Sequence, residues 1–193
     1  MTTPKLHSIW SNLRRHLSEA KIPHAMIGAL ALSQYGIVRY TADIDLLADF
    51  QDKHKIMQMM ETLGFDCFQN TDMFAQFDAE HGILGKVDFL FVQTDEGREI
   101  LDRAVVLTDG ILGELSVVQP TGYAILKLMA IANNSERELQ DIADLKALLK
   151  ATAADEMDSV FDPLDLKAVR TFAIRFGVLE QFISLFPALD TGS

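Results

Sequence analysis

The sequence predicts an α/β (α+β) fold: a mixed sheet with flanking helices over residues 1–119, followed by a small helical part over residues 120–193. Short apolar runs that alternate with stretches of helical spacing predict strands and helices in turn through the first part. From Pro120 onward nearly every stretch has helical spacing. A length of 193 residues suits one domain, or a core domain with a helical appendage, and is long enough to bury a proper core.

The first elements are defined by apolar spacing and by the proline or glycine that ends them. An apolar stripe through Ile9, Leu13, Leu17 and Ala20 predicts an amphipathic helix. The next apolar run is short and stops at a glycine, which is typical of a buried strand. The expected elements are a helix over Leu6–Ala20 ended by Pro23, a strand over His24–Ile27, and a helix over Ala29–Tyr35 closed by Gly36.

The middle of the chain alternates between strands and helices. Acids alternate with Ile44 and Leu46, which predicts a strand with one apolar and one acidic face. The expected elements are, in order, a strand over Asp43–Ala48, a helix through Ile56–Leu63 closed by Gly64, strands over Phe65–Gln69 and Met73–Phe77, a turn at His81-Gly82, a strand over Leu84–Val92, a helix from its cap Asp95 to Arg103, and a strand over Glu114–Val118.

The last part is expected to be helical. Asp162 followed by Pro163 is typical of a helix start, because the acid caps the helix and proline fits its first turn. We expect helices over Thr121–Ala132, Ser135–Ala151 and Leu164–Phe186, with residues 152–162 as a surface linker.

Charge and composition limit the possible partners. With 17 Lys and Arg against 28 Asp and Glu, the net charge is −11, which argues against a general nucleic-acid coat because phosphate binding needs clustered basic residues. One local basic patch could still hold a nucleic-acid substrate. Cys67 is the only cysteine, so a disulfide framework within the chain is excluded and a reducing compartment is expected.

No membrane segment is expected. A spanning helix needs about 20 apolar residues, whereas the best stretch, Ala124–Ala132, is short and carries Lys127. The first residues run into a mixed-charge helix without an apolar segment typical of a signal peptide. We therefore expect a cytoplasmic protein with no membrane partner.

Three aspartates stand out as candidate metal ligands. Asp43 and Asp45 are two residues apart in one strand, so their side chains share a face. Asp88 lies inside an apolar strand, where an acid is costly unless it is solvated or liganded. Carboxylate oxygens are the ligands that Mg²⁺ prefers, and three of them suit a two-metal site for phosphoryl or nucleotidyl transfer. The alternative is that Asp43 and Asp45 are exposed acids at a strand end and that Asp88 lies on a solvated sheet face.

Gly28 adds a candidate phosphate contact. It ends a strand directly before a helix, where a glycine lets the backbone approach a phosphate and the first N–H groups of the helix attract an anion. By itself a glycine at this place more often marks only a turn.

The combination of these pieces resembles the signature of the minimal nucleotidyltransferases of the DNA polymerase beta superfamily. The resembling pieces are Ile27-Gly28-Ala29-Leu30-Ala31-Leu32, Tyr35-Gly36, Arg39-Tyr40-Thr41-Ala42-Asp43-Ile44-Asp45-Leu46, Lys127-Leu128-Met129-Ala130, and Arg137 before Asp141-Ile142-Ala143-Asp144-Leu145. Their order looks closest to the abortive-infection, type IV toxin-like branch, and it extends over about two-thirds of the chain, from Ile27 to Leu149.

The resemblance implies a mixed-sheet nucleotidyltransferase core and a role for each matching residue. Asp43 and Asp45 would ligate the Mg²⁺ (or Mn²⁺) that carries the NTP, and together with Asp88 they would hold a second ion. Gly28 and Ala29 would hold phosphates through their backbone. Ala29 replaces a second Gly or Ser of the family: if only the backbone binds, alanine is harmless, and if a hydroxyl is needed, nucleotide binding weakens.

Five further residues have a functional interpretation, a structural one, or both. Lys127 would contact phosphate, or it is an ordinary amphipathic-helix lysine. Arg39 would touch phosphate or only fix its loop, while Thr41 most simply caps the turn before the acids. Asp141 and Asp144, three residues apart on one helix face, would orient Lys127 or help the active site, or they lie on a solvated face with an Arg137–Asp141 pair.

The resemblance therefore implies a Mg²⁺-dependent nucleotidyltransferase that moves a nucleoside monophosphate from an NTP, such as ATP, to an acceptor hydroxyl. The acceptor would be a protein, a tRNA end or a small molecule. A toxin-like protein would have a small protein partner encoded nearby, as in toxin–antitoxin pairs. The alternative function is a catalytically weak or inactive module of the same fold that acts as a regulator or antitoxin-like binder.

Overall fold

The computed structural model describes residues 4–79, 85–133, 138–154 and 157–185. The chain forms two units: Met1–Gln34 with Val38–Val118, and Tyr35–Ile37 with Gln119–Ser193. We describe each unit separately. None of the described helices combines the length and the apolar composition needed to cross a bilayer.

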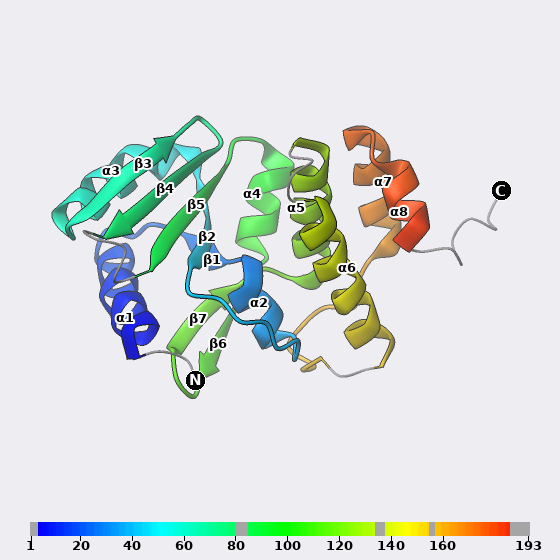
Figure 1. Ribbon diagram of the computed structural model, residues 1–193, viewed down its shortest axis with the longest axis horizontal. Helices are drawn as coiled ribbons and strands as arrows, with labels where there is room; N and C mark the ends of the chain where they lie inside the picture. Colours follow the sequence, from blue (N-terminus) through cyan, green and yellow to red (C-terminus); the bar gives the residue numbers. More distant parts are fainter. Residues whose placement is uncertain (1–3, 80–84, 134–137, 155–156, 186–193) are drawn as a thin grey trace. The chain divides into compact units, whose positions relative to one another are not determined.

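The first unit is built on one mixed sheet of seven strands in the order β3-β4-β5-β2-β1-β7-β6 (Figure 1). Its strands are β1 (His24–Met26), β2 (Ile44–Asp49), β3 (Phe65–Asn70), β4 (Phe74–Ala79), β5 (Lys86–Val92), β6 (Val105–Asp109) and β7 (Gly113–Val117). β2 runs parallel to β5, and β1 runs parallel to β7, whereas all other neighbours are antiparallel. The predicted mixed α/β architecture is confirmed.

The central strands alternate between buried apolar and partly open polar side chains. In β2, Ile44 and Leu46 are fully buried while Asp45 between them is half-buried. In β5, Val87 and Phe89 flank Asp88 in the same way. Successive side chains of a strand point to opposite faces, so the apolar side chains fix which way the aspartates point.

The helices of this unit are α1 (Pro4–Glu19), α2 (Gly28–Gln34), α3 (Lys53–Thr62), which follows the 3-10 turn η1 (Phe50–Asp52), and α4 (Asp95–Asp102). α1 buries Ile9, Leu13 and Leu17 as the spacing predicts, whereas Ala20 lies beyond the helix end and is exposed. The cap of α4 is Thr94, whose Oγ1 accepts a hydrogen bond from Gly97 N at 3.1 Å. The prediction of Asp95 as the cap is wrong by one residue.

Strand β6 was not predicted. It forms an antiparallel hairpin with β7, and the Asp109 carboxylate closes the turn by accepting hydrogen bonds from Ile111 N and Leu112 N, each at 2.7 Å. The predicted turn at His81-Gly82 lies outside the described residues.

The second unit consists mainly of four helices, α5 (Pro120–Asn133), α6 (Glu138–Ala153), α7 (Leu166–Phe176) and α8 (Leu179–Leu185) (Figure 1). One helix over Leu164–Phe186 was expected, and this is wrong. Gly177 has a left-handed backbone (φ 73°) that ends α7, a conformation that glycine adopts without strain. The cap of α7 is Asp165, which accepts from Lys167 N and Ala168 N, and not Asp162.

The segment before α7 is held more firmly than a surface linker. Phe161 is buried and its ring lies edge-on to the Tyr35 ring, with 4.8 Å between centroids. Asp162 N donates to Gln119 Oε1 at 2.9 Å. The expectation of an exposed linker over residues 152–162 is therefore wrong at Phe161, because this side chain is part of the core of the second unit.

Candidate functional site

Asp45 and Asp88 are direct neighbours across two parallel strands. In the register of β2 and β5, Ile44 pairs with Val87, and the next residue, Asp45, pairs with Asp88. Adjacent strands lie about 4.8 Å apart, so the two aspartates occupy neighbouring positions on one face of the sheet. Both residues are half-buried, and the Oδ1 atom of Asp88 is buried.

Asp43 lies just before β2, and the turn that Thr41 forms sets its position. Thr41 Oγ1 accepts a hydrogen bond from Asp43 N at 3.1 Å and donates to Asp43 O at 3.2 Å. The Asp43 carboxylate accepts from the backbone N–H of Lys86 at 3.4 Å. Because Lys86 is two residues before Asp88, this contact puts Asp43 at the same end of β5 as the other two acids.

A fourth residue, Gln76, joins this face from β4. The register of β4 and β5 pairs Gln76 with Asp88, and Gln76 Nε2 donates to Asp88 Oδ2 at 2.8 Å. Asp88 therefore lies between Asp45 on one neighbouring strand and Gln76 on the other. The sequence analysis missed Gln76, since a single glutamine in a strand matches no motif.

Gly28 lies against the Asp45 side chain. Its backbone is left-handed (φ 62°), and a Cβ at this position would lie 2.7 Å from Asp45 Cγ. No side chain fits there without moving the carboxylate. Ile27 N also donates to Asp45 O at 3.0 Å, so the start of α2 and the second residue of β2 are packed together. Ala29, the next residue, is buried.

The three carboxylates suit a divalent cation by type and register, but their side chains do not form a finished coordination shell. Among the described residues, no group of three or more His, Cys, Asp or Glu side chains is arranged so that it could hold a metal ion. Asp43 and Asp88 each accept a hydrogen bond from a protein donor. The donor chemistry of these carboxylates fits Mg²⁺ or Mn²⁺.

Lys127 belongs to the second unit and has two partners there. Its Nζ donates to Asp141 Oδ1 and to Asp144 Oδ2, each at 2.7 Å, and lies over the Tyr123 ring at 5.6 Å from its centroid. Lys127 is 8% exposed, Asp141 1% and Asp144 3%. The shared contact that the spacing of Asp141 and Asp144 allowed is therefore present, and it is buried. Arg137, the other partner considered for Asp141, lies outside the described residues.

Arg39, the last of the predicted residues, is half-buried in the segment between α2 and β2. That segment also exposes Val38 and Tyr40, at 98% and 79%.

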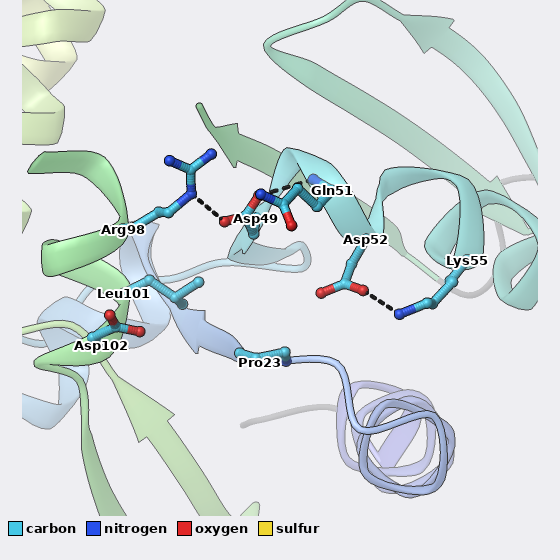
Figure 2. A pocket seen from close by; sticks show the side chains of 8 residues that line it. All are labelled: Pro23, Asp49, Gln51, Asp52, Lys55, Arg98, Leu101 and Asp102. Carbon is cyan, nitrogen blue, oxygen red and sulfur yellow. Dashed lines mark hydrogen bonds and ion pairs between the residues drawn. The ribbon is translucent and has the colours of Figure 1, made fainter. Parts of the chain in front are cut away.

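A separate hollow of about 270 Å³ lies at the other end of β2, where Asp49 ends the strand (Figure 2). Figure 2 shows the Arg98 side chain directed at Asp49 and the Lys55 side chain at Asp52, and the joined atoms are 2.6 Å apart in each pair. The hydrogen bond that Arg98 donates to Asp49 raises the pKa of Arg98 above its usual value. Asp43, Asp45 and Asp88 do not line this hollow. Four of its charged groups form the pairs Arg98–Asp49 and Lys55–Asp52, so we assign it a structural role.

The sheet and its flanking helices are similar to those of solved structures that have the nucleotidyltransferase fold. ANT(2'')-Ia in complex with adenylyl-2''-tobramycin matches with a TM-score of 0.64 at 13% identity, over 88% of this chain and 98% of that one. An antigenic nucleotidyltransferase-like protein from Paracoccidioides brasiliensis matches with a TM-score of 0.56 at 16% identity, over 98% and 92% of the two chains.

At such low identities the likeness shows the fold alone. No protein-family model matches the chain, and no curated protein sequence matches it. The expected nucleotidyltransferase core is confirmed at the level of the fold.

Proposed function

We propose that the protein is a Mg²⁺- or Mn²⁺-dependent nucleotidyltransferase that moves a nucleoside monophosphate from an NTP to an acceptor hydroxyl. The observation that carries this proposal is the register of Asp45 opposite Asp88, with Asp43 at the same end of the two parallel strands. Carboxylates at neighbouring positions repel one another because they carry like charges. A divalent cation bound between the three aspartates would remove this repulsion.

The proposed roles of the three acids follow from their positions. Asp43 and Asp45 would hold the ion that accompanies the triphosphate, and Asp88 would join them in holding a second one. Bound divalent ions neutralise phosphate charge and lower the pKa of an acceptor hydroxyl. The protein's own contribution is to keep the reacting groups aligned and the carboxylates preorganised. The tight packing of Gly28 on Asp45 supports such preorganisation.

The remaining residues are proposed to bind the nucleotide. Backbone N–H groups at Gly28 and Ala29 would face the β- and γ-phosphates, and Thr41 would hold the turn that presents Asp43. Arg39 would provide a positive charge beside the phosphates. Lys127 has three ammonium donors, and Asp141 and Asp144 use two of them, which leaves one for a phosphate oxygen.

The acceptor and the biological context are proposals from resemblance. ANT(2'')-Ia, whose structure contains adenylyl-2''-tobramycin, supports a small-molecule acceptor as one candidate beside a protein or a tRNA end. The order of the sequence motifs supports the abortive-infection, toxin-like branch and a small protein partner encoded nearby. We also propose the division into a nucleotidyltransferase core over residues 1–119 and a helical part over residues 120–193.

The test is transfer of label from NTPs labelled at the α-phosphate, with Mg²⁺ or Mn²⁺, to the protein itself, to tRNA and to pooled small molecules. We expect metal-dependent labelling of one acceptor class that Asp88→Asn abolishes. Asp66→Asn, which removes an exposed acid from β3, is the matched control and should keep activity. Nucleotide binding without transfer to any acceptor would favour the inactive binding module instead.

A further inference from the structure

The Gln76 side chain donates a direct hydrogen bond to one of the three carboxylates, that of Asp88. It is half-buried, and its amide nitrogen lies 2.8 Å from Asp88 Oδ2. An ionised carboxylate only accepts hydrogen bonds, so the amide must present its NH₂ group to Asp88. The bond uses Oδ2, and the other oxygen of this carboxylate, Oδ1, is buried.

The backbone that carries Gln76 is rigidly held. Its neighbours Ala75 and Phe77 are buried on the opposite face, where they pair with Phe89 and Val87 of β5. The Phe77 and Phe89 rings contact edge to face, with 6.0 Å between centroids. The amide therefore projects from a strand that cannot move without disturbing the core, which is what an orienting donor requires.

The residue type also matters. A glutamine brings a donor without charge, so it fixes the carboxylate without neutralising it, whereas a lysine or arginine here would compete with a cation for Asp88. Carboxylates that ligate metal ions are commonly oriented by such a second hydrogen bond, and removing it weakens metal affinity by about 10–100-fold.

We propose that Gln76 is a positioning residue that orients the Asp88 carboxylate for a divalent cation. This inference rests on the proposed function, because it concerns the same three aspartates. Gln76 itself touches neither nucleotide nor ion; it acts through Asp88.

The experiment is a titration of Mn²⁺ into the full chain by calorimetry, with α,β-methylene analogues of the four NTPs present, so that neither turnover nor an acceptor is needed. Gln76→Met keeps the length of the side chain and removes the donor, and we expect it to weaken Mn²⁺ binding by about 10–100-fold. The control is Gln93→Met: Gln93 donates to Asp72 O at the same 2.8 Å distance but on the exposed loop after β5. This control should bind Mn²⁺ like the wild type.

A double-mutant cycle distinguishes positioning from general destabilisation. If Gln76 acts through Asp88, Gln76→Met causes no further loss of Mn²⁺ affinity in an Asp88→Asn background. Equal losses in both backgrounds would overturn the proposal, and so would a Gln76→Met protein that binds Mn²⁺ within threefold of wild type. If Gln76→Met does not fold, Gln76→Asn, whose amide is one methylene shorter, replaces it, and unchanged affinity there overturns the proposal. A wild-type protein that binds no Mn²⁺ with any analogue refutes the proposed function itself.

Discussion

The buried cluster of Lys127, Asp141 and Asp144 allows a quantitative prediction. Lys127→Met removes the cation that donates to both carboxylates, and the two acids are 1% and 3% exposed. Breaking a buried ion pair from one side costs about 3–5 kcal/mol, because the remaining charge is left buried. We expect Lys127→Met to lose about this much free energy of unfolding.

The two acids should not contribute equally. Asp144 keeps a hydrogen bond from Gln140 Nε2 at 3.1 Å, whereas Asp141 Oδ2 is buried without a hydrogen-bond partner among the described residues. In the Lys127→Met background, Asp141→Asn should therefore recover more stability than Asp144→Asn, because it neutralises the less well-bonded charge.

Urea unfolding followed by far-ultraviolet circular dichroism measures these differences, since the second unit is mainly helical. Lys146→Met, which removes an exposed lysine of α6, is the control and should change stability by at most about 0.5 kcal/mol. A Lys127→Met protein within about 1 kcal/mol of wild type would refute the view that the cluster holds α5 to α6. Phosphate binding would then remain as the explanation for a lysine at position 127.

Three other predictions concern single residues. Gly28→Ala should cost about 1–2 kcal/mol for the left-handed backbone alone, and it should weaken NTP binding in thermal melts because the new Cβ displaces Asp45; unchanged binding would contradict the packing argument. Burial, opposed by the hydrogen bond to the Ile22 carbonyl, lowers the pKa of His24 below 6.5, so the unfolded chain binds this proton more strongly and stability should fall as the pH drops below about 6.5. His24→Gln should remove this part of the pH dependence of urea unfolding and His54→Gln, at an exposed position, should not; equal effects would refute the assignment. Asp165→Ala should cost about 1 kcal/mol in the same assay, because it removes the N-cap of α7, and no loss would contradict that role.

The central strands were predictable because burial imposes a clear alternation on them. In β5, Val87, Phe89 and Phe91 are buried, and that pattern is visible as apolar residues around an isolated aspartate. β6 was missed for the opposite reason: its side chains alternate between half-buried and exposed, and Val106 is 64% exposed. The Asp109-Gly110 pair that follows is a turn signal that indicates the hairpin.

The helix over Leu164–Phe186 was predicted as one element because apolar spacing continues on both sides of Gly177. Spacing does not detect a change of helix axis, whereas the glycine itself is the usual signal for a helix end.

The partners within the candidate site could be predicted only in part. Alternation puts Asp43 and Asp45 on one face, but the pairing of Asp45 with Asp88 depends on which strands are neighbours, and this is a property of the sheet. Gln76 and the burial of Lys127 depend likewise on contacts between segments distant in sequence. The structure also brings Lys127 together with Asp141 and Asp144, which the i, i+3 spacing allowed without requiring.

The most direct test of a metal-dependent nucleotide site on this sheet face is a set of thermal melts with each of the four NTPs, with and without Mg²⁺ or Mn²⁺, on the wild type and on Asp45→Asn. A ligand at 100 times its Kd adds about 2.7 kcal/mol to the free energy of unfolding, which gives a clear shift. We expect a metal-dependent shift with at least one NTP that Asp45→Asn abolishes and that Asp66→Asn retains. No shift with any nucleotide, or an equal shift in Asp45→Asn, would contradict the assignment of this face as the nucleotide site.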